Sequence, residues 1–262
     1  MRCRIVSTSP DVTEILCALN LFEDLAGVSR FCDWPPEVKI LPVVSDFLKL
    51  DAQALEEARP DVVICSTAVQ KEIVRDLTER HVRTVVLHPH SLQSIFDNIR
   101  LLGDLFGRTF EAGDLVSRMK REFFLIREEA SRFEKNPRVF CEEWGDPLIV
   151  GIGWIQEMSE AAGGRPTHPE LFPEVGSERR TIPAAALRER NPEIILLSWC
   201  GMGGRVNSRI LEAREGWKEI EAVKSGRVYP VNDTLFVRPG PRLIEGTRQI
   251  LNYVRDFQNG RD

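Results

Sequence analysis

The 262-residue sequence lacks several features that would place it in other classes of protein. It has no apolar run near the ~20 residues needed to cross a bilayer, so membrane insertion is not expected. Its net charge of −5 and its scattered lysines and arginines offer no basic surface for nucleic acid. Six cysteines are too few and too dispersed for a disulfide scaffold, and they favour a reducing compartment.

The motifs of common enzyme classes are also missing. There is no G-x-S-x-G nucleophile elbow, no P-loop and no H-E-x-x-H zinc motif. Glu142 and Glu143 are adjacent on a predicted strand, so their side chains should point to opposite faces and cannot form a catalytic pair. We therefore expect no catalytic residue and no catalytic cofactor.

An export signal is not visible at the start of the sequence. Residues 1–25 show no basic start, no apolar stretch and no small-residue cleavage site, which together mark a secretory leader. Our interpretation is a non-exported protein with a cytoplasmic location. The alternative is a periplasmic or cell-surface protein whose leader has been removed.

Short β-rich runs alternate with helical stretches, which predicts an α/β protein with parallel sheets covered by helices. Ser9 is the predicted N-cap of the first helix, with Pro10 as its first residue. The predicted strands are 4–7, 25–28, 61–65, 84–87, 139–141, 193–197 and 228–231.

One block of sequence occurs twice. Residues 55–66 read LEEARPDVVICS, and residues 187–198 read LRERNPEIILLS. In each block a helix is expected to end before the proline, and four apolar residues after the acidic residue form a buried strand. A Val-x-Ser segment begins twelve residues before each block, at Val43 and Val175. Helix–proline–strand junctions are common, but the matched lead-in favours two similar lobes.

A long helix is predicted between the lobes, over residues 109–135. This stretch has no proline and no strand-like run, and Asn136-Pro137 should end it. We expect an N-terminal α/β lobe over 1–108 and a C-terminal α/β lobe over 136–262. A helical connection permits little hinge motion, so a ligand cleft between the lobes should be largely preformed.

Six segments in this order resemble a known family: STSPDVTEIL (7–16), GVSRFCDWPPE (27–37), VSDF (44–47), RPDVV (59–63), WIQEMSEAAGG (154–164) and RPGPR (238–242). Together they resemble the cobalamin-binding branch of the class III (helical-backbone, TroA-like) substrate-binding proteins of ABC importers. The resemblance covers nearly the whole chain. It implies two Rossmann-like lobes joined by one backbone helix, with cobalamin, haem or an iron–siderophore bound between them without chemistry.

Candidate ligand-binding residues come mostly from segments that follow predicted strands, because ligands of α/β sheets bind beyond the carboxyl ends of the strands. A large flat macrocycle needs apolar faces to lie against, and aromatic residues are frequent in these segments. Arg238 and Asp33 are candidates for contacts with amide or phosphate groups at the rim. For each tryptophan, the alternative is packing inside its own lobe. The candidates are Ser9, Pro10, Phe31, Cys32, Asp33, Trp34, Phe47, Thr67, Trp144, Trp154, Trp199, Phe236 and Arg238.

Two cysteines lie in predicted ligand-facing loops, Cys32 in one lobe and Cys200 in the other. No metal site of the protein itself is predicted, although the Cys32 thiolate is a candidate contact for a ligand's metal. The more frequent alternative is a loop cysteine without a role. Joining Cys32, Cys200 and a histidine gives a further alternative, a metal-dependent corrinoid-processing enzyme. His168 is expected in a surface loop.

The resemblance breaks at two positions. Exported relatives carry a glutamate on each lobe that pairs with permease arginines, seven residues before the proline of the repeated block. Here those positions hold Gln53 and Ala185, which should weaken docking to an ABC permease. Our leading hypothesis is therefore a non-exported corrinoid-binding protein for storage, delivery or sensing. The alternative is the substrate-binding component of an ABC importer for cobalamin, haem or an iron–siderophore.

Overall fold

The computed structural model describes residues 3–46, 48–66 and 68–260. The chain divides into two compact units. Unit 1 is Met1–Pro89 with Gln93–Ser117, and unit 2 is His90–Leu92 with Arg118–Asp262. Each unit contains a sheet with helices on both of its faces, which is the predicted α/β class.

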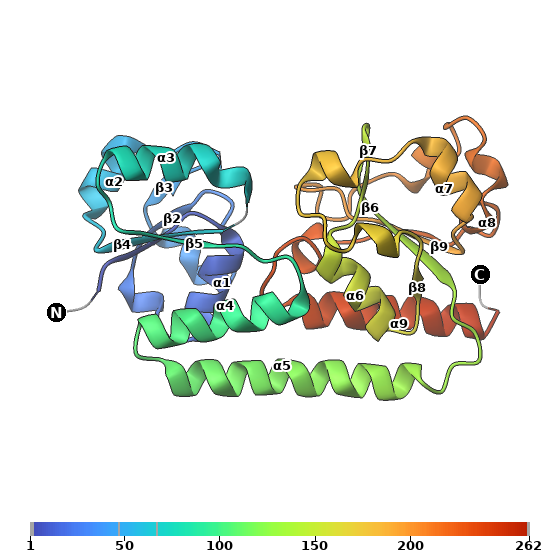
Figure 1. Ribbon diagram of the computed structural model, residues 1–262, viewed down its shortest axis with the longest axis horizontal. Helices are drawn as coiled ribbons and strands as arrows, with labels where there is room; N and C mark the ends of the chain where they lie inside the picture. The colour runs from blue at the N-terminus through green and yellow to red at the C-terminus, as the bar shows by residue number, and fades with distance from the viewer. Residues whose placement is uncertain (1–2, 47, 67, 261–262) are drawn as a thin grey trace. The chain divides into compact units, whose positions relative to one another are not determined.

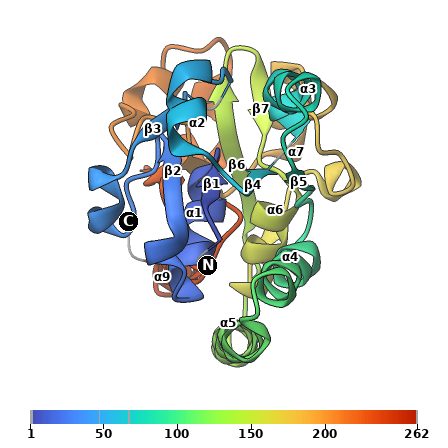
Figure 2. The same cartoon turned by 90° about the vertical axis from the view of Figure 1, so that its left-hand side faces the viewer.

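Unit 1 is built on a fully parallel sheet with the strand order β3-β2-β1-β4-β5, which Figure 2 shows from one side of the sheet to the other. Strands β1 and β4 are buried along their whole length, as expected for central parallel strands covered on both faces. The strands are β1 (Ile5–Ser7), β2 (Leu25–Ser29), β3 (Val43–Ser45), β4 (Val62–Ser66) and β5 (Thr84–Leu87).

Two helices cover each face of this sheet. In Figure 1, α2 and α3 lie on one face and α1 and α4 on the other. Ser9 has the extended backbone of an N-cap and Pro10 is the first helical residue of α1, as the sequence predicts. The helices are α1 (Pro10–Ala18), α2 (Ala52–Ala58), α3 (Lys71–Glu79) and α4 (Leu92–Leu105).

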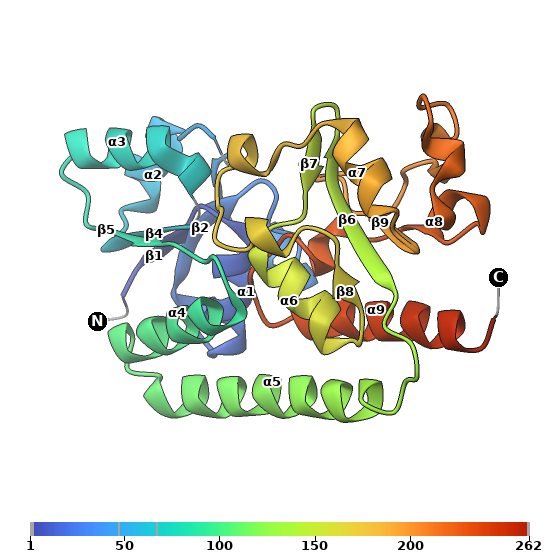
Figure 3. The same ribbon diagram turned by 45° about the vertical axis from the view of Figure 1, so that its right-hand side comes forward.

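Unit 2 has a mixed sheet with the order β10-β9-β6-β7, and β8 also pairs with β6. All pairings are parallel except that of β7 with β6. Helices α6 and α9 pack side by side (Figure 3). The strands are β6 (Arg138–Gly145), β7 (Leu148–Val150), β8 (Arg165–Pro166), β9 (Ile194–Leu197) and β10 (Val228–Pro230). The helices are α6 (Gly153–Ala161), α7 (Ala184–Arg190), α8 (Glu221–Lys224) and α9 (Leu243–Gln258).

The long predicted helix is present as α5 (Thr109–Ala130) and contains residues of both units. Its 22 residues rise about 33 Å. It ends five residues earlier than predicted, where the Ser131 hydroxyl donates to the Glu128 carbonyl. Such local hydrogen bonds compete with continuation of a helix. Within the described ranges, no helix is both long enough and apolar enough to cross a membrane.

The repeated block has the same local structure in both units. Helices α2 and α7 end at left-handed residues with nearly equal φ, Arg59 at 43° and Asn191 at 45°. A buried strand follows each, and an arginine from the neighbouring strand segment donates to the carbonyls at the helix end. Arg4 Nε lies 2.9 Å from the Ala58 oxygen, and Arg138 Nε lies 2.7 Å from the Asn191 oxygen. The helix–strand junction is therefore the same in both units, although the sheet of unit 1 is fully parallel and that of unit 2 is mixed.

Three features differ from the sequence prediction. The Val-x-Ser lead-in forms β3 in unit 1, but its counterpart at Val175 precedes a 3-10 helix and forms no strand. Strand β6 runs on to Gly145, so Trp144 lies within a strand and not after it. Strands β7 and β8 have only three and two residues and were too short to show a pattern. Short 3-10 helices are Phe22–Asp24, Pro36–Ile40, Ala68–Gln70, Pro169–Leu171, Ser177–Arg180, Ser208–Leu211, Trp217–Glu219 and Asp233–Leu235.

Candidate ligand-binding site

The loop after β2 presents aromatic rings on the surface of unit 1. Phe31 is 51% exposed and Trp34 is 44% exposed, and Asp33 between them is also exposed. Cys32 turns inward, and its sulfur lies 3.1 Å from the Thr13 hydroxyl of α1. The loop therefore offers two aromatic faces and one carboxylate, while the cysteine fixes the loop to the helix behind it.

The carboxyl ends of β1 and β4 are lined by buried polar groups that bond to one another. The Gln70 amide donates to the Thr8 carbonyl at 2.8 Å, and its oxygen accepts from the Ser66 N–H at 2.9 Å. Ser9 and Pro10 are buried at the start of α1, where the Ser9 hydroxyl donates to Asp11. Burial raises the pKa of Asp11, and its hydrogen bond from Ser9 opposes that shift. Because these residues are buried and bonded to one another, they stabilise the ends of the strands and expose little surface to a ligand.

Two predicted site residues, Phe47 and Thr67, lie outside the residues that the structure describes.

Unit 2 brings together two tryptophans that the sequence analysis placed in the site. Trp144 comes from β6 and Trp199 directly follows Ser198 at the end of β9. Their ring centroids are 5.5 Å apart with the planes tilted by 38°, within the range of favourable aromatic pairs. Trp144 is 40% exposed, and its indole nitrogen donates to the Asp146 carbonyl at 3.0 Å. The pair forms an apolar surface at the carboxyl ends of neighbouring parallel strands.

A buried carboxylate holds this pair from behind. Glu142 is 0% exposed, and its Oε1 accepts from the indole nitrogen of Trp199 at 2.9 Å. Arg214 donates to both oxygens of the same carboxylate, at 2.7 and 2.9 Å. The Arg214 guanidinium also stacks on Trp217, 4.4 Å from the ring centroid. We call Glu142, Trp199 and Arg214 the Glu142 cluster. From the sequence, Glu142 could be judged only as a neighbour of Glu143, and no local pattern indicates its contacts with Trp199 and Arg214.

A glycine leaves room for the Glu142 cluster. A Cβ at Gly145 would overlap Cζ2 of Trp199 and Nη2 of Arg214. The residue that ends β6 therefore has to be glycine for the tryptophan and the arginine to occupy these positions.

The neighbouring Glu143 has a separate arginine partner. Arg180, 2% exposed, donates to both carboxylate oxygens of Glu143 at 2.7 and 3.0 Å, and also to the Val150 carbonyl. The two adjacent glutamates therefore belong to different ion pairs, each with its own arginine.

Trp154 and Phe236 are buried, and the indole nitrogen of Trp154 donates to the Phe236 carbonyl at 2.8 Å. Both side chains therefore pack inside unit 2, which is the alternative stated for Trp154. Arg238 is partly exposed near them, after the 3-10 helix Asp233–Leu235.

Among the described residues, no group of three or more His, Cys, Asp or Glu side chains is arranged to hold a metal ion. All six cysteines lie in the described part of the chain, and none forms a disulfide. Cys200 is exposed overall, but its thiol is largely desolvated. This desolvation, together with the nearby charges of Glu143 and Asp233, raises the pKa of the Cys200 thiol to about 12. His168 is buried, not in a surface loop as predicted, and its Nδ1 lies 2.8 Å from the Thr167 hydroxyl.

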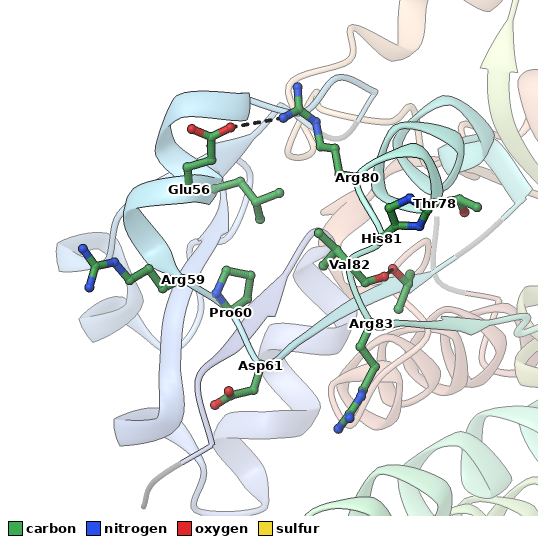
Figure 4. Close-up of a pocket in the computed structure, with 11 residues that line it drawn as sticks. Glu56, Arg59, Pro60, Asp61, Thr78, Arg80, His81, Val82 and Arg83 are labelled. Carbon is green, nitrogen blue, oxygen red and sulfur yellow. Dashed lines mark hydrogen bonds and ion pairs between the residues drawn. The ribbon is translucent and has the colours of Figure 1, made fainter.

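One groove of unit 1 lies at the opposite edge of the sheet. It has a volume of about 1060 Å³ and lies near Pro60 and Arg83, just before β4 and β5 begin. Figure 4 shows its polar lining, with Glu56 and Arg80 paired at 3.3 Å. Ligands of parallel sheets bind at the carboxyl ends, so the groove does not coincide with the predicted site.

The two positions discussed for permease docking are exposed, Gln53 on α2 and Ala185 on α7. The Gln53 amide donates to Glu57 at 3.0 Å. The expected carboxylates are therefore replaced by an amide and a methyl group on otherwise accessible helices.

The fold and the aromatic strand ends define a ligand-binding protein, and comparison with known proteins identifies its family. The family model of the periplasmic binding protein matches residues 5–234, and the chain belongs to this family, whose members bind ligands without catalysis. Its class is the class III periplasmic binding proteins.

Individual relatives are more distant. The chain is 29% identical over 257 residues to the uncharacterized ABC transporter substrate-binding lipoprotein YvrC of Bacillus subtilis, covering 96% of this chain and 79% of YvrC. It is 25% identical to the vitamin B12-binding protein of Salmonella choleraesuis, covering 95% and 89% of the two chains. The heme-binding protein RhuT of Roseiflexus has the same fold, with a TM-score of 0.82, 22% identity and coverage of 98% and 99%. These relatives favour the importer alternative over the non-exported hypothesis.

Proposed function

We propose that the protein is the substrate-binding component of an ABC importer and binds a cobalamin-like corrinoid. The observation that carries the ligand class is the pair Trp144 and Trp199 at the carboxyl ends of β6 and β9. A corrin ring is large and flat, and an aromatic pair at a strand end supplies an apolar surface against which it can lie.

We further propose that unit 1 contributes Phe31 and Trp34 to ligand binding. Both rings are about half exposed on the loop after β2, where the fold class places ligand contacts. Asp33 lies between them and can accept hydrogen bonds from amide side chains of a corrinoid. Trp154 and Phe236 are left out of the proposed site because they are buried in unit 2.

Haem is the second candidate ligand, supported by the fold similarity to RhuT. Haem iron takes an axial ligand such as histidine, cysteine, methionine or tyrosine. The chain has two tyrosines, and Tyr229 stacks on Tyr253 with centroids 4.0 Å apart and planes within 7°. This pairing argues against a tyrosine ligand, so a haem would depend on a histidine, on Cys200 or on Met202. Cobalamin carries an axial nitrogen ligand of its own in its nucleotide loop, so it does not require such a residue from the protein.

The proposed location is outside the cytoplasmic membrane, with an ABC permease as partner. Support comes from the family and from the lipoprotein name of the B. subtilis relative. Gln53 and Ala185 remain the positions where this chain lacks a docking charge, so we expect its permease to be less dependent on that charge pair.

The proposal is tested by isothermal titration calorimetry of the protein with cyanocobalamin, dicyanocobinamide and haemin. We expect one cyanocobalamin per chain with a dissociation constant tighter than about 100 μM. Cobinamide separates recognition of the corrin ring from recognition of the nucleotide loop. Saturable haemin binding with no response to either corrinoid would contradict the proposed corrinoid ligand and identify haem as the ligand.

A further inference from the structure

The geometry points to Glu142 as a positioning residue for the ligand surface of unit 2, an inference that rests on the proposed function. Its side chain is 0% exposed and so does not contact a ligand. Its effect on binding passes through Trp199, which it holds by a hydrogen bond of 2.9 Å.

Glu142 is suited to this task because its own position is fixed. It lies on the central strand β6, which pairs with β7, β8 and β9. Arg214 occupies both carboxylate oxygens and is itself held against Trp217. Charge-assisted, bidentate hydrogen bonds of this kind have strong directional preferences. The position of the Glu142 carboxylate is therefore fixed in the ligand-free protein.

The position of Trp199 in turn sets the surface that faces a ligand. Its ring packs on Trp144, the more exposed member of the pair, and on the bare backbone of Gly145. Releasing the Trp199 indole would let both rings adopt other rotamers. A ligand would then have to order them on binding, which lowers affinity without loss of a direct contact.

A double-mutant cycle separates positioning from general stabilisation. Glu142→Gln removes the charge that holds Arg214, so the Trp199 indole is left with a neutral acceptor that no bidentate pair fixes in place. Trp199→Phe keeps a ring but removes the indole N–H. We expect each single change to weaken cyanocobalamin binding about tenfold, as for loss of a well-packed anchor. In the Trp199→Phe protein, Glu142→Gln should add less than about a twofold further loss, because the two act as one unit.

Glu143→Gln is the matched control. It makes the same substitution on the adjacent residue of β6, also paired with a buried arginine, but Glu143 does not contact Trp199. It should leave the affinity unchanged. An equal loss of affinity in Glu143→Gln, or additive effects of Glu142→Gln and Trp199→Phe, would overturn the inference.

Circular dichroism of the ligand-free proteins tests positioning independently of the ligand. Paired indoles give an exciton signal, which Glu142→Gln should reduce and Glu143→Gln should preserve. If cyanocobalamin and haemin both fail to bind, the proposed function fails, while this signal still decides the role of Glu142. An unchanged signal in Glu142→Gln overturns that role.

A second variant covers the case in which Glu142→Gln does not fold. Gly145→Ala would displace Trp199 and Arg214 without altering the carboxylate, and it should reduce the exciton signal and the affinity together. Gly113→Ala is its control, since a Cβ there meets no atom within 4 Å. A Gly145→Ala protein with the wild-type signal and affinity would contradict the inference.

Discussion

The indole of Trp144 packs against that of Trp199 at a centroid separation of 5.5 Å, joining the end of β6 to the segment after β9. The two residues are 55 positions apart in sequence, and the parallel pairing of β6 with β9 brings them together. This relationship gives the protein an aromatic surface where its fold class binds ligands.

Trp144→Ala should weaken cyanocobalamin binding at least tenfold, the range of an aromatic hot spot. Because Trp144 is 40% exposed, the free energy of unfolding should fall by less than the roughly 3–5 kcal/mol typical of a fully buried tryptophan. Calorimetry and urea unfolding measure the two effects. Phe124→Ala on α5 removes another exposed aromatic ring and serves as control. Equal cyanocobalamin affinities of Trp144→Ala and the wild-type protein would show that the Trp144–Trp199 surface does not contact the ligand.

Trp154→Phe should lower the free energy of unfolding by about 1–3 kcal/mol. The substitution leaves the buried Phe236 carbonyl without its indole donor and creates a small cavity. Urea unfolding monitored by far-ultraviolet circular dichroism gives the value. A change below about 0.5 kcal/mol would show that the hydrogen bond does not stabilise unit 2.

Asp11→Asn should stabilise the protein increasingly as the pH rises. Burial raises the folded-state pKa of Asp11, so the folded protein holds this proton more tightly than the unfolded chain. The carboxyl group therefore lowers stability as the pH rises from its unfolded pKa, near 4, through the raised folded value. The difference in unfolding free energy between variant and wild type should be small at low pH and grow across this window. A difference independent of pH would contradict the assignment.

Arg59→Gly should stabilise the protein by about 1 kcal/mol, because glycine adopts the left-handed conformation at the end of α2 without a steric penalty. Asn191→Gly at the equivalent place in unit 2 should not be stabilising, since asparagine tolerates this conformation better than arginine. The change also removes the Asn191 side-chain oxygen that accepts from the Glu221 N–H at 2.8 Å. Differential scanning calorimetry of both variants checks the order. A larger gain at Asn191 than at Arg59 would contradict the steric penalty as the cause of the stabilisation.

Much of the fold follows from local patterns in the sequence. The repeated block predicted the α2–β4 and α7–β9 junctions because proline, the acidic residue and four apolar residues act over short distances. Strand β7 escaped notice, since three residues after a turn carry too little periodicity. The end of α5 was also misplaced, because its last turn closes by hydrogen bonds from Arg132 to Glu129 and from Phe133 to Ala130 that no residue pattern marks.

The candidate site was less predictable. Exposed Trp34 and Trp144 could be anticipated from their segments, whereas Trp154 has the same chemistry and is buried. The role of Glu142 depends on Arg214, which is 72 residues away in sequence. Only the three-dimensional structure brings the two side chains together, so no local motif could have revealed the pair.

The most direct test of the central claim is the ratio of the dissociation constants for cyanocobalamin and haemin, measured by calorimetry on the same wild-type preparation. A corrinoid-binding protein should bind cyanocobalamin with a dissociation constant below about 100 μM and at least tenfold more tightly than haemin. Tighter binding of haemin, or binding of neither, would contradict the account.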